Sequence, residues 1–221
     1  MKPSQTTSPD FIGGLVSGLE PVRPARAGRM IALALLVEVC VVAAAAWMRG
    51  LHMVDHGRIA DPAFAGLVAI LAAGAAASAA TMATLSFPGR TMPPAVRTFV
   101  LALPPAIAVL LVAFSPWGGS FHGFVAVVVE GFGCTRNTII VATPAWIAGL
   151  LLLRRLAPLD PLRVGLFTAS SALLTAALAV QMACPNCDSW HMALSHYVPL
   201  LVAAWVAAML SPLVLAPGRR N

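Results

Sequence analysis

The residues best suited to chemistry lie in one short stretch, Cys184-Pro185-Asn186-Cys187-Asp188-Ser189-Trp190-His191. It contains a C-x-x-C pair followed by a histidine. Thiolate and imidazole are the donors of zinc, cadmium and copper(I) sites, and Asp188 could orient His191 from outside the ligand shell. In an oxidising compartment the same cysteines could form a static disulfide instead. The stretch therefore indicates sulfur chemistry without deciding which kind.

The composition indicates that a membrane holds this stretch in place. Of the 221 residues, 59% are hydrophobic and 10% are charged, against roughly 45–50% and about 25% in soluble domains. Six apolar segments come near the ~20 residues that cross a bilayer as a helix. Their expected bounds are 29–49, 62–86, 99–117, 137–156, 164–183 and 197–216. We predict an all-α integral membrane protein with six transmembrane helices, in which Pro104-Pro105 causes a kink or a late start of the third helix.

The basic residues predict the orientation. Eleven fall on the side that carries both chain ends, and three fall on the other side: Arg49, Arg58 and Arg136. The positive-inside rule therefore predicts that both termini are cytoplasmic. Glu38 lies in the middle of the first span, where a carboxyl group is costly and often functional.

With this topology, the residues that bind metals or undergo redox reactions gather at the outer surface. They are His52, His56, His122, His191, His196, Cys134, Cys184 and Cys187, whereas Cys40 lies inside a span. Cys134 and Cys184 are each 25 residues from Leu159, so a hairpin of the fourth and fifth helices brings them to similar depth. We predict a site of Cys134, Cys184, Cys187 and His191 that binds metal or forms a disulfide. The spacing of His52 and His56 would suit a metal on a helix, but in so short a loop a solvated surface is favoured.

Residues 1–28 are predicted to form a cytoplasmic arm, 29–217 the six-helix sensor domain, and 218–221 a cytoplasmic tail. Ser8-Pro9-Asp10 is typical of a helix start. An apolar stripe follows at helical spacing: Phe11, Ile12, Leu15, Val16 and Leu19. Nearby glycines weaken this helix, which favours either folding on a protein partner or lying on the membrane surface.

Several parts of the chain together resemble the NrsF-type family of membrane anti-sigma factors (negative regulator of sigma F). Residues Phe11-Ile12, Leu15 and Pro21-Val22 are similar to the start of the family. The middle resembles its "C…I…P…LL…LRR" and "AP…P…G" segments through Gly133-Cys134, Ile139, Pro144, Leu150 to Leu153, Arg154-Arg155, Ala157-Pro158, Pro161 and Gly165. Cys184-Pro185 resembles the outer "HCP" of the family, with Ala183 in place of its histidine and Cys187 as an extra cysteine.

The resemblance implies a six-helix anti-sigma factor of the bacterial inner membrane. It implies that the arm binds an extracytoplasmic-function sigma factor, that Cys134 and Cys184 sense metal or oxidative stress, and that the sigma factor is then released. The expected partners are that sigma factor and membrane lipids, without direct nucleic-acid binding. No obligatory cofactor and no enzymatic activity are expected, with zinc, copper or cadmium as a possible signal. The alternative is a quinone-linked thiol–disulfide oxidoreductase that uses the C-x-x-C, although such an enzyme normally needs a second cysteine pair.

Overall fold

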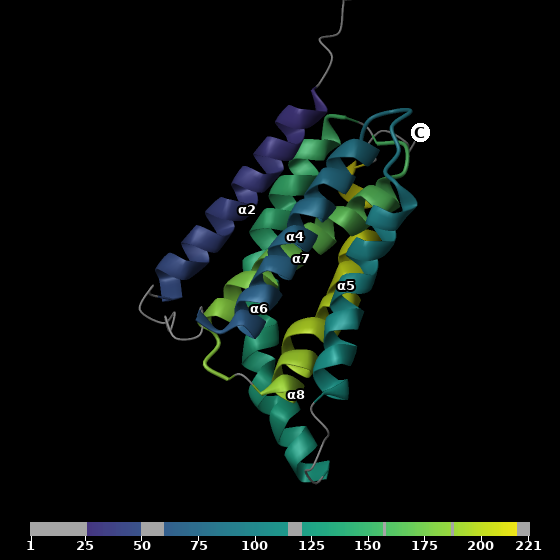
Figure 1. The fold of residues 1–221 in the computed structure, drawn as a ribbon. Helices are drawn as coiled ribbons and strands as arrows, with labels where there is room; N and C mark the ends of the chain where they lie inside the picture. The colour runs from purple at the N-terminus through teal and green to yellow at the C-terminus, as the bar shows by residue number, and fades with distance from the viewer. Residues whose placement is uncertain (1–25, 50–59, 115–120, 157, 187, 216–221) are drawn as a thin grey trace, which may run out of the picture.

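The computed structural model describes residues 26–49, 60–114, 121–156, 158–186 and 188–215 (Figure 1). Within these ranges every regular element is a helix. Six helical segments are long and apolar enough to cross a membrane. The predicted all-α class is therefore confirmed, and the six segments that could span a membrane equal the predicted number. The elements are α2 (Ala27–Arg49), α4 (Pro62–Leu85), α5 (Pro94–Ala113), α6 (Phe121–Arg154), α7 (Pro161–Ala183), α8 (Ser189–Met192), η2 (Ala193–Tyr197), α9 (Val198–Leu210) and α10 (Pro212–Leu215).

Three predicted helix starts need correction. Helix α5 begins at Pro94 and not at residue 99, so the late start is wrong; a proline is well tolerated in the first turn, where its missing N–H has no helical partner. Helix α6 begins at Phe121 and not at residue 137, because the apolar residues before Cys134 continue the same helix. The last segment begins at Ser189 and not at residue 197. Cys134, His191 and His196 precede the predicted helix starts, and in the structure all three lie within helices.

Helix α7 is the centre of the bundle. In its most apolar stretch 83% of residues are buried, compared with 28% or fewer in each of the other five spanning segments. Small residues let neighbouring backbones approach closely: a side chain added at Gly165 would meet Ser211 of the last segment, and one added at Gly74 of α4 would meet Leu103 of α5. The position of α7 therefore fixes where its C-terminal end, at Cys184, lies in the molecule.

Helix α2 lies at the edge of the bundle (Figure 1). Only 12% of its most apolar stretch is buried, and large apolar side chains such as Val39 and Trp47 point away from the other helices. Apolar side chains on an outer face are expected where lipid replaces water. The helix begins at Ala27 and is therefore the spanning segment that adjoins the predicted N-terminal arm in the chain.

Helix α6 is longer than a bilayer requires. Its 34 residues correspond to about 51 Å, while a hydrocarbon core is about 30 Å thick. Figure 1 shows the N-terminal part of α6 extending past the ends of the neighbouring helices, on the side where α8 begins. Cys134 therefore lies within a continuous helix, which holds its backbone rigidly beside the end of α7.

Candidate metal and thiol site

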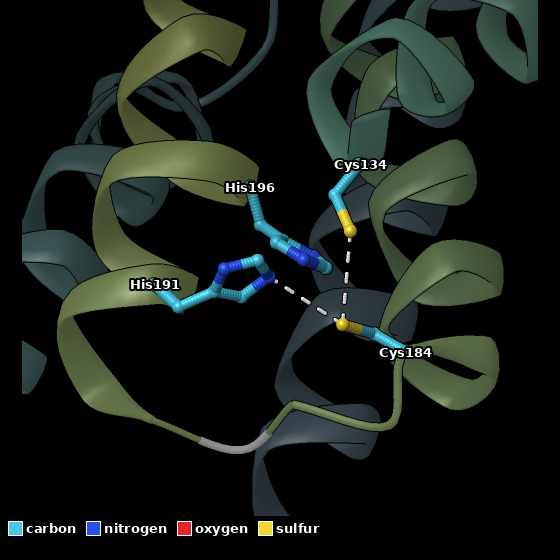
Figure 2. A group of neighbouring side chains, drawn as sticks. All are labelled: Cys134, Cys184, His191 and His196. Carbon is cyan, nitrogen blue, oxygen red and sulfur yellow. Dashed lines mark hydrogen bonds between the residues drawn. The ribbon is translucent and has the colours of Figure 1, made fainter. Parts of the chain in front are cut away.

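Four side chains from three parts of the chain converge at this end of the bundle (Figure 2). They are Cys134 on α6, Cys184 directly after α7, His191 on α8 and His196 on η2. Their ligand atoms all lie within 4.8 Å of one another. The sulfurs of Cys134 and Cys184 are 3.7 Å apart, and Cys184 Sγ is 3.5 Å from His191 Nε2. The predicted meeting of Cys134, Cys184 and His191 is therefore observed.

Pro185 determines the position of Cys184. A proline disfavours helical conformation in the residue before it, and Cys184 has extended dihedral angles, with φ −77° and ψ 122°. Its N–H still donates to the Val180 carbonyl at 2.8 Å, which completes the last turn of α7. Cys184 Sγ also lies 3.5 Å from the carbonyl oxygen of Asn186. The helix end therefore turns the thiol inward, where it is only 5% exposed.

Asp188 positions His191 through the backbone. Its carboxylate caps α8 by accepting a hydrogen bond from the His191 N–H at 2.9 Å, as aspartate commonly does at a helix N-terminus. The Asp188 N–H in turn donates to Asn186 Oδ1 at 2.8 Å. Asp188 thus starts the helix that carries His191, and the hydrogen bond that was expected to its imidazole goes to its main chain.

His196 is the member of the cluster that the sequence interpretation left out. Residues five apart on an α-helix point about 140° away from each other, so His191 and His196 would not share a face. Here the intervening turn is a π-helix, Ala193–Tyr197, in which the Val198 N–H bonds to the Ala193 carbonyl. The wider turn brings the two rings to a centroid distance of 5.5 Å. Single π turns inside α-helices are frequent at functional sites.

Helix α6 and the π turn are held together by close backbone contact. The hydroxyl of Thr135 donates to the Ser195 carbonyl at 2.8 Å. One turn earlier, Gly131 leaves room for Ser195, whose Oγ and Cβ occupy the space that a larger side chain would need. These two contacts fix His196 relative to Cys134, because Ser195 immediately precedes the histidine.

The spacing of the four donors suits a tetrahedral ion. Bonds of about 2.3 Å to sulfur and about 2.05 Å to nitrogen separate two sulfurs by about 3.8 Å and a sulfur from a nitrogen by about 3.6 Å. The corresponding distances here are 3.7 Å and 3.5 Å. The remaining pairs, all within 4.8 Å, would close by at most about 1.5 Å to complete the tetrahedron. Two thiols and two imidazoles are also the donor set that soft and borderline metals prefer.

The histidines carry unused hydrogen-bonding capacity. His191 and His196 are 4% and 1% exposed, and among the described residues His191 Nδ1 and both ring nitrogens of His196 have no hydrogen-bond partner. Buried polar atoms are nearly always paired, and a buried group without a partner costs about 1–3 kcal/mol. Such a cost is expected where the group has a ligand to bind.

The structure does not place several other residues that the sequence predicted for the site or the arm. Cys187, His52 and His56 lie outside the described residues, as does the whole apolar stripe Phe11, Ile12, Leu15, Val16 and Leu19. The side chain of His122 is likewise not described. Cys40 is exposed on α2 and does not join the cluster.

Comparison with known proteins identifies the family. A family model described as NrsF, negative regulator of sigma F, matches residues 15–216. Searches among curated proteins and among solved structures gave no significant match. The matched range runs from the arm through the last helix and includes all four residues of the cluster. The chain therefore belongs to the NrsF family, the negative regulators of sigma F.

Proposed function

We propose that this protein is an anti-sigma factor of the bacterial inner membrane that holds an extracytoplasmic-function sigma factor and releases it when metal or oxidant reaches Cys134, Cys184, His191 and His196. The observation that carries the proposal is the convergence of these four donors in a chain of the NrsF family. A regulator of this kind needs an input site, and the cluster is chemically equipped to be one.

The distribution of charge supports the proposed orientation. Eleven basic residues lie on the side of the two termini and three on the other, which favours cytoplasmic termini. The cluster then lies at the periplasmic end of the bundle. The arm, residues 1–28, lies in the cytoplasm with its stripe of Phe11, Ile12, Leu15, Val16 and Leu19 available to the sigma factor. Signal and effector would thus be on opposite sides of the membrane.

Two inputs fit the same residues. Zinc, copper or cadmium would be held by the two sulfurs and two ring nitrogens, with loss of the thiol protons. Alternatively, hydrogen peroxide would oxidise Cys134 and Cys184 to a disulfide: the two thiols lose two protons and two electrons, and the hydrogen peroxide is reduced to two molecules of water. Either reaction joins α6 to the end of α7, and the metal also joins both to η2.

The energy needed for release is small. A tenfold loss of sigma affinity corresponds to about 1.4 kcal/mol, and a ligand can supply it only through different affinities for the two states of the protein. Structural zinc sites bind with apparent free energies of about 10–16 kcal/mol. A modest fraction of such binding energy, directed into helix movement, is therefore sufficient.

A reporter under sigma-factor control tests the input site. We expect Cys134→Ser and Cys184→Ser to keep repression and to lose induction by cadmium, zinc, copper or peroxide. Cys40→Ser is the matched control, because Cys40 is exposed outside the cluster, and it should respond like the wild type. Unchanged induction in both cluster variants would assign the cysteines a structural role. Absence of any sigma-dependent output would instead favour the thiol oxidoreductase, for which bound quinone or thiol-oxidising turnover is the direct test.

The arm is tested separately. Deletion of residues 1–20 should abolish capture of the sigma factor in a pull-down from solubilised membranes while leaving membrane insertion intact. Capture by the shortened protein would remove the arm from the mechanism.

A further inference from the structure

A buried carboxyl group links α2 to the centre of the bundle. Glu38 lies in the middle of α2 and is 8% exposed. Its Oε1 pairs with the hydroxyl of Ser171 on α7. The Ser171 Oγ also lies 3.1 Å from the carbonyl oxygen of Ala75 on α4. One polar contact therefore joins three helices, and it includes Glu38, the single acidic residue of α2.

The number of protons available to Ser171 and Glu38 determines which hydrogen bonds this contact can form. A serine hydroxyl has one proton, so Ser171 donates to one acceptor at a time. When it donates to Ala75, a protonated Glu38 can donate to the serine oxygen, and the chain of hydrogen bonds is complete without a charge. A glutamine at position 38 would reproduce this arrangement through its amide N–H, whereas a leucine would remove it.

Around this contact α2 is loosely packed against its neighbours. A cavity of about 150 Å³ separates it from α6 and α7 beside Glu38, between Val37, Gly149 and Ala172. A second cavity of about 90 Å³ lies between the outer end of α2, at Ala45 and Met48, and the two cysteines Cys134 and Cys184. Close-packed interiors resist movement, and cavities permit it. The outer end of α2 thus borders the two cysteines across this cavity.

We propose that Glu38 and Ser171 form the pivot through which α2 carries the state of the cysteine site to the N-terminal arm. This inference rests on the proposed function. Glu38 is 10 residues from Met48 and 11 from Ala27, which places it about 15 Å from the outer end and about 16 Å from the inner end of the helix. Tilting of α2 about this point moves its two ends by similar amounts in opposite directions. A change in the cavity beside the cysteines therefore becomes a displacement of the segment that precedes Ala27.

The test separates ligand binding from its transmission. The variants are Glu38→Leu, Ser171→Ala and Glu38→Gln in the full-length protein, with Val39→Leu as the control, since Val39 is 65% exposed on the same helix. Leucine favours membrane insertion, so Glu38→Leu is not expected to fail at that step. Two quantities are measured: protection of Cys134 and Cys184 from alkylation by added cadmium, in membranes, and the ratio of induced to basal output of the sigma-dependent reporter.

We expect Glu38→Leu and Ser171→Ala to keep wild-type cadmium protection and to lower the induction ratio by two- to tenfold, the range of one hydrogen bond. Glu38→Gln and Val39→Leu should keep the wild-type ratio. A wild-type ratio in Glu38→Leu overturns the pivot, as does an equal loss in Glu38→Gln and Glu38→Leu, which would require an ionisable group instead. Absence of cadmium protection in the wild type would refute metal sensing at the site and not the pivot.

Discussion

Gly131 and Gly133 offer a matched test of how α6 holds the π turn. Both lie on α6, two residues apart. A Cβ at position 131 would meet Ser195, with its Cβ 2.6 Å away and its Oγ closer still, and would approach His191 Nδ1 to 3.6 Å. A Cβ at position 133 meets nothing within 4 Å. The substitutions Gly131→Ala and Gly133→Ala therefore share their effect on the helix and differ in the clash.

The expected difference follows from two opposing terms. Replacing glycine by alanine within a helix stabilises it by about 1 kcal/mol at either position. Overpacking costs about 1–3 kcal/mol, and it applies at position 131 alone. Gly131→Ala should therefore be less stable than Gly133→Ala by about 2 kcal/mol, or about 4–8 °C in Tm for a chain of this size. Because Ser195 moves together with His196, metal affinity should fall by about 10–100-fold, as when a supporting residue of a metal site is lost.

Thermal unfolding and cadmium titration of the two purified variants in detergent micelles measure both quantities. Gly133→Ala should equal or exceed the wild type in Tm and bind cadmium normally. Equal Tm values and equal affinities in the two variants would refute the close packing of α6 on η2. A loss of Tm with normal cadmium affinity would show that this packing serves the fold and not the site.

Three further predictions concern individual residues. His196→Ala should weaken cadmium binding at least tenfold in equilibrium titration, because it removes one of four donors; unchanged affinity would exclude this imidazole from the site. Pro185→Ala should reduce induction in the reporter by allowing α7 to continue and Cys184 to rotate, and wild-type induction would show that proline is not what positions the thiol. Gly165→Ala should lower Tm, because the added group meets Ser211, whereas Gly66→Ala meets nothing within 4 Å and should not; equal Tm values would contradict the close approach of α7 and the last segment.

Patterns of composition and spacing were sufficient for the number of segments that could span a membrane and for the meeting of Cys134 with Cys184. Both follow from regular geometry. The number of segments follows from the rise per residue of a helix and the thickness of a bilayer, and the meeting of the cysteines follows from a helical hairpin in which each cysteine is 25 residues from Leu159. The placement of His191 beside Cys184 agrees with the expectation drawn from its position after the C-x-x-C. These inferences use distances along the chain that a regular helix converts directly into distances in space.

His196 and the early start of α6 required information that regular geometry does not contain. A π turn changes the direction of every later side chain, and its presence depends on how Ser195 packs against Gly131 and Thr135 of another helix. The partners of Glu38 were equally inaccessible. A hydrogen bond to a serine or threonine was foreseeable for a buried carboxyl group, but the sequence offers many hydroxyls, and tertiary packing selects Ser171.

One thiol of the pair is buried, at Cys184, and the other is half-buried, at Cys134, which restricts contact with large molecules. Cys184 is 5% exposed, and a cavity of about 90 Å³ borders both cysteines. A partly dehydrated metal ion or a peroxide fits such a space, whereas glutathione and the active sites of other proteins do not. Thiols and disulfides of larger molecules would exchange with an open cysteine pair. Partial burial therefore favours reaction of this cysteine pair with small molecules over exchange with large ones.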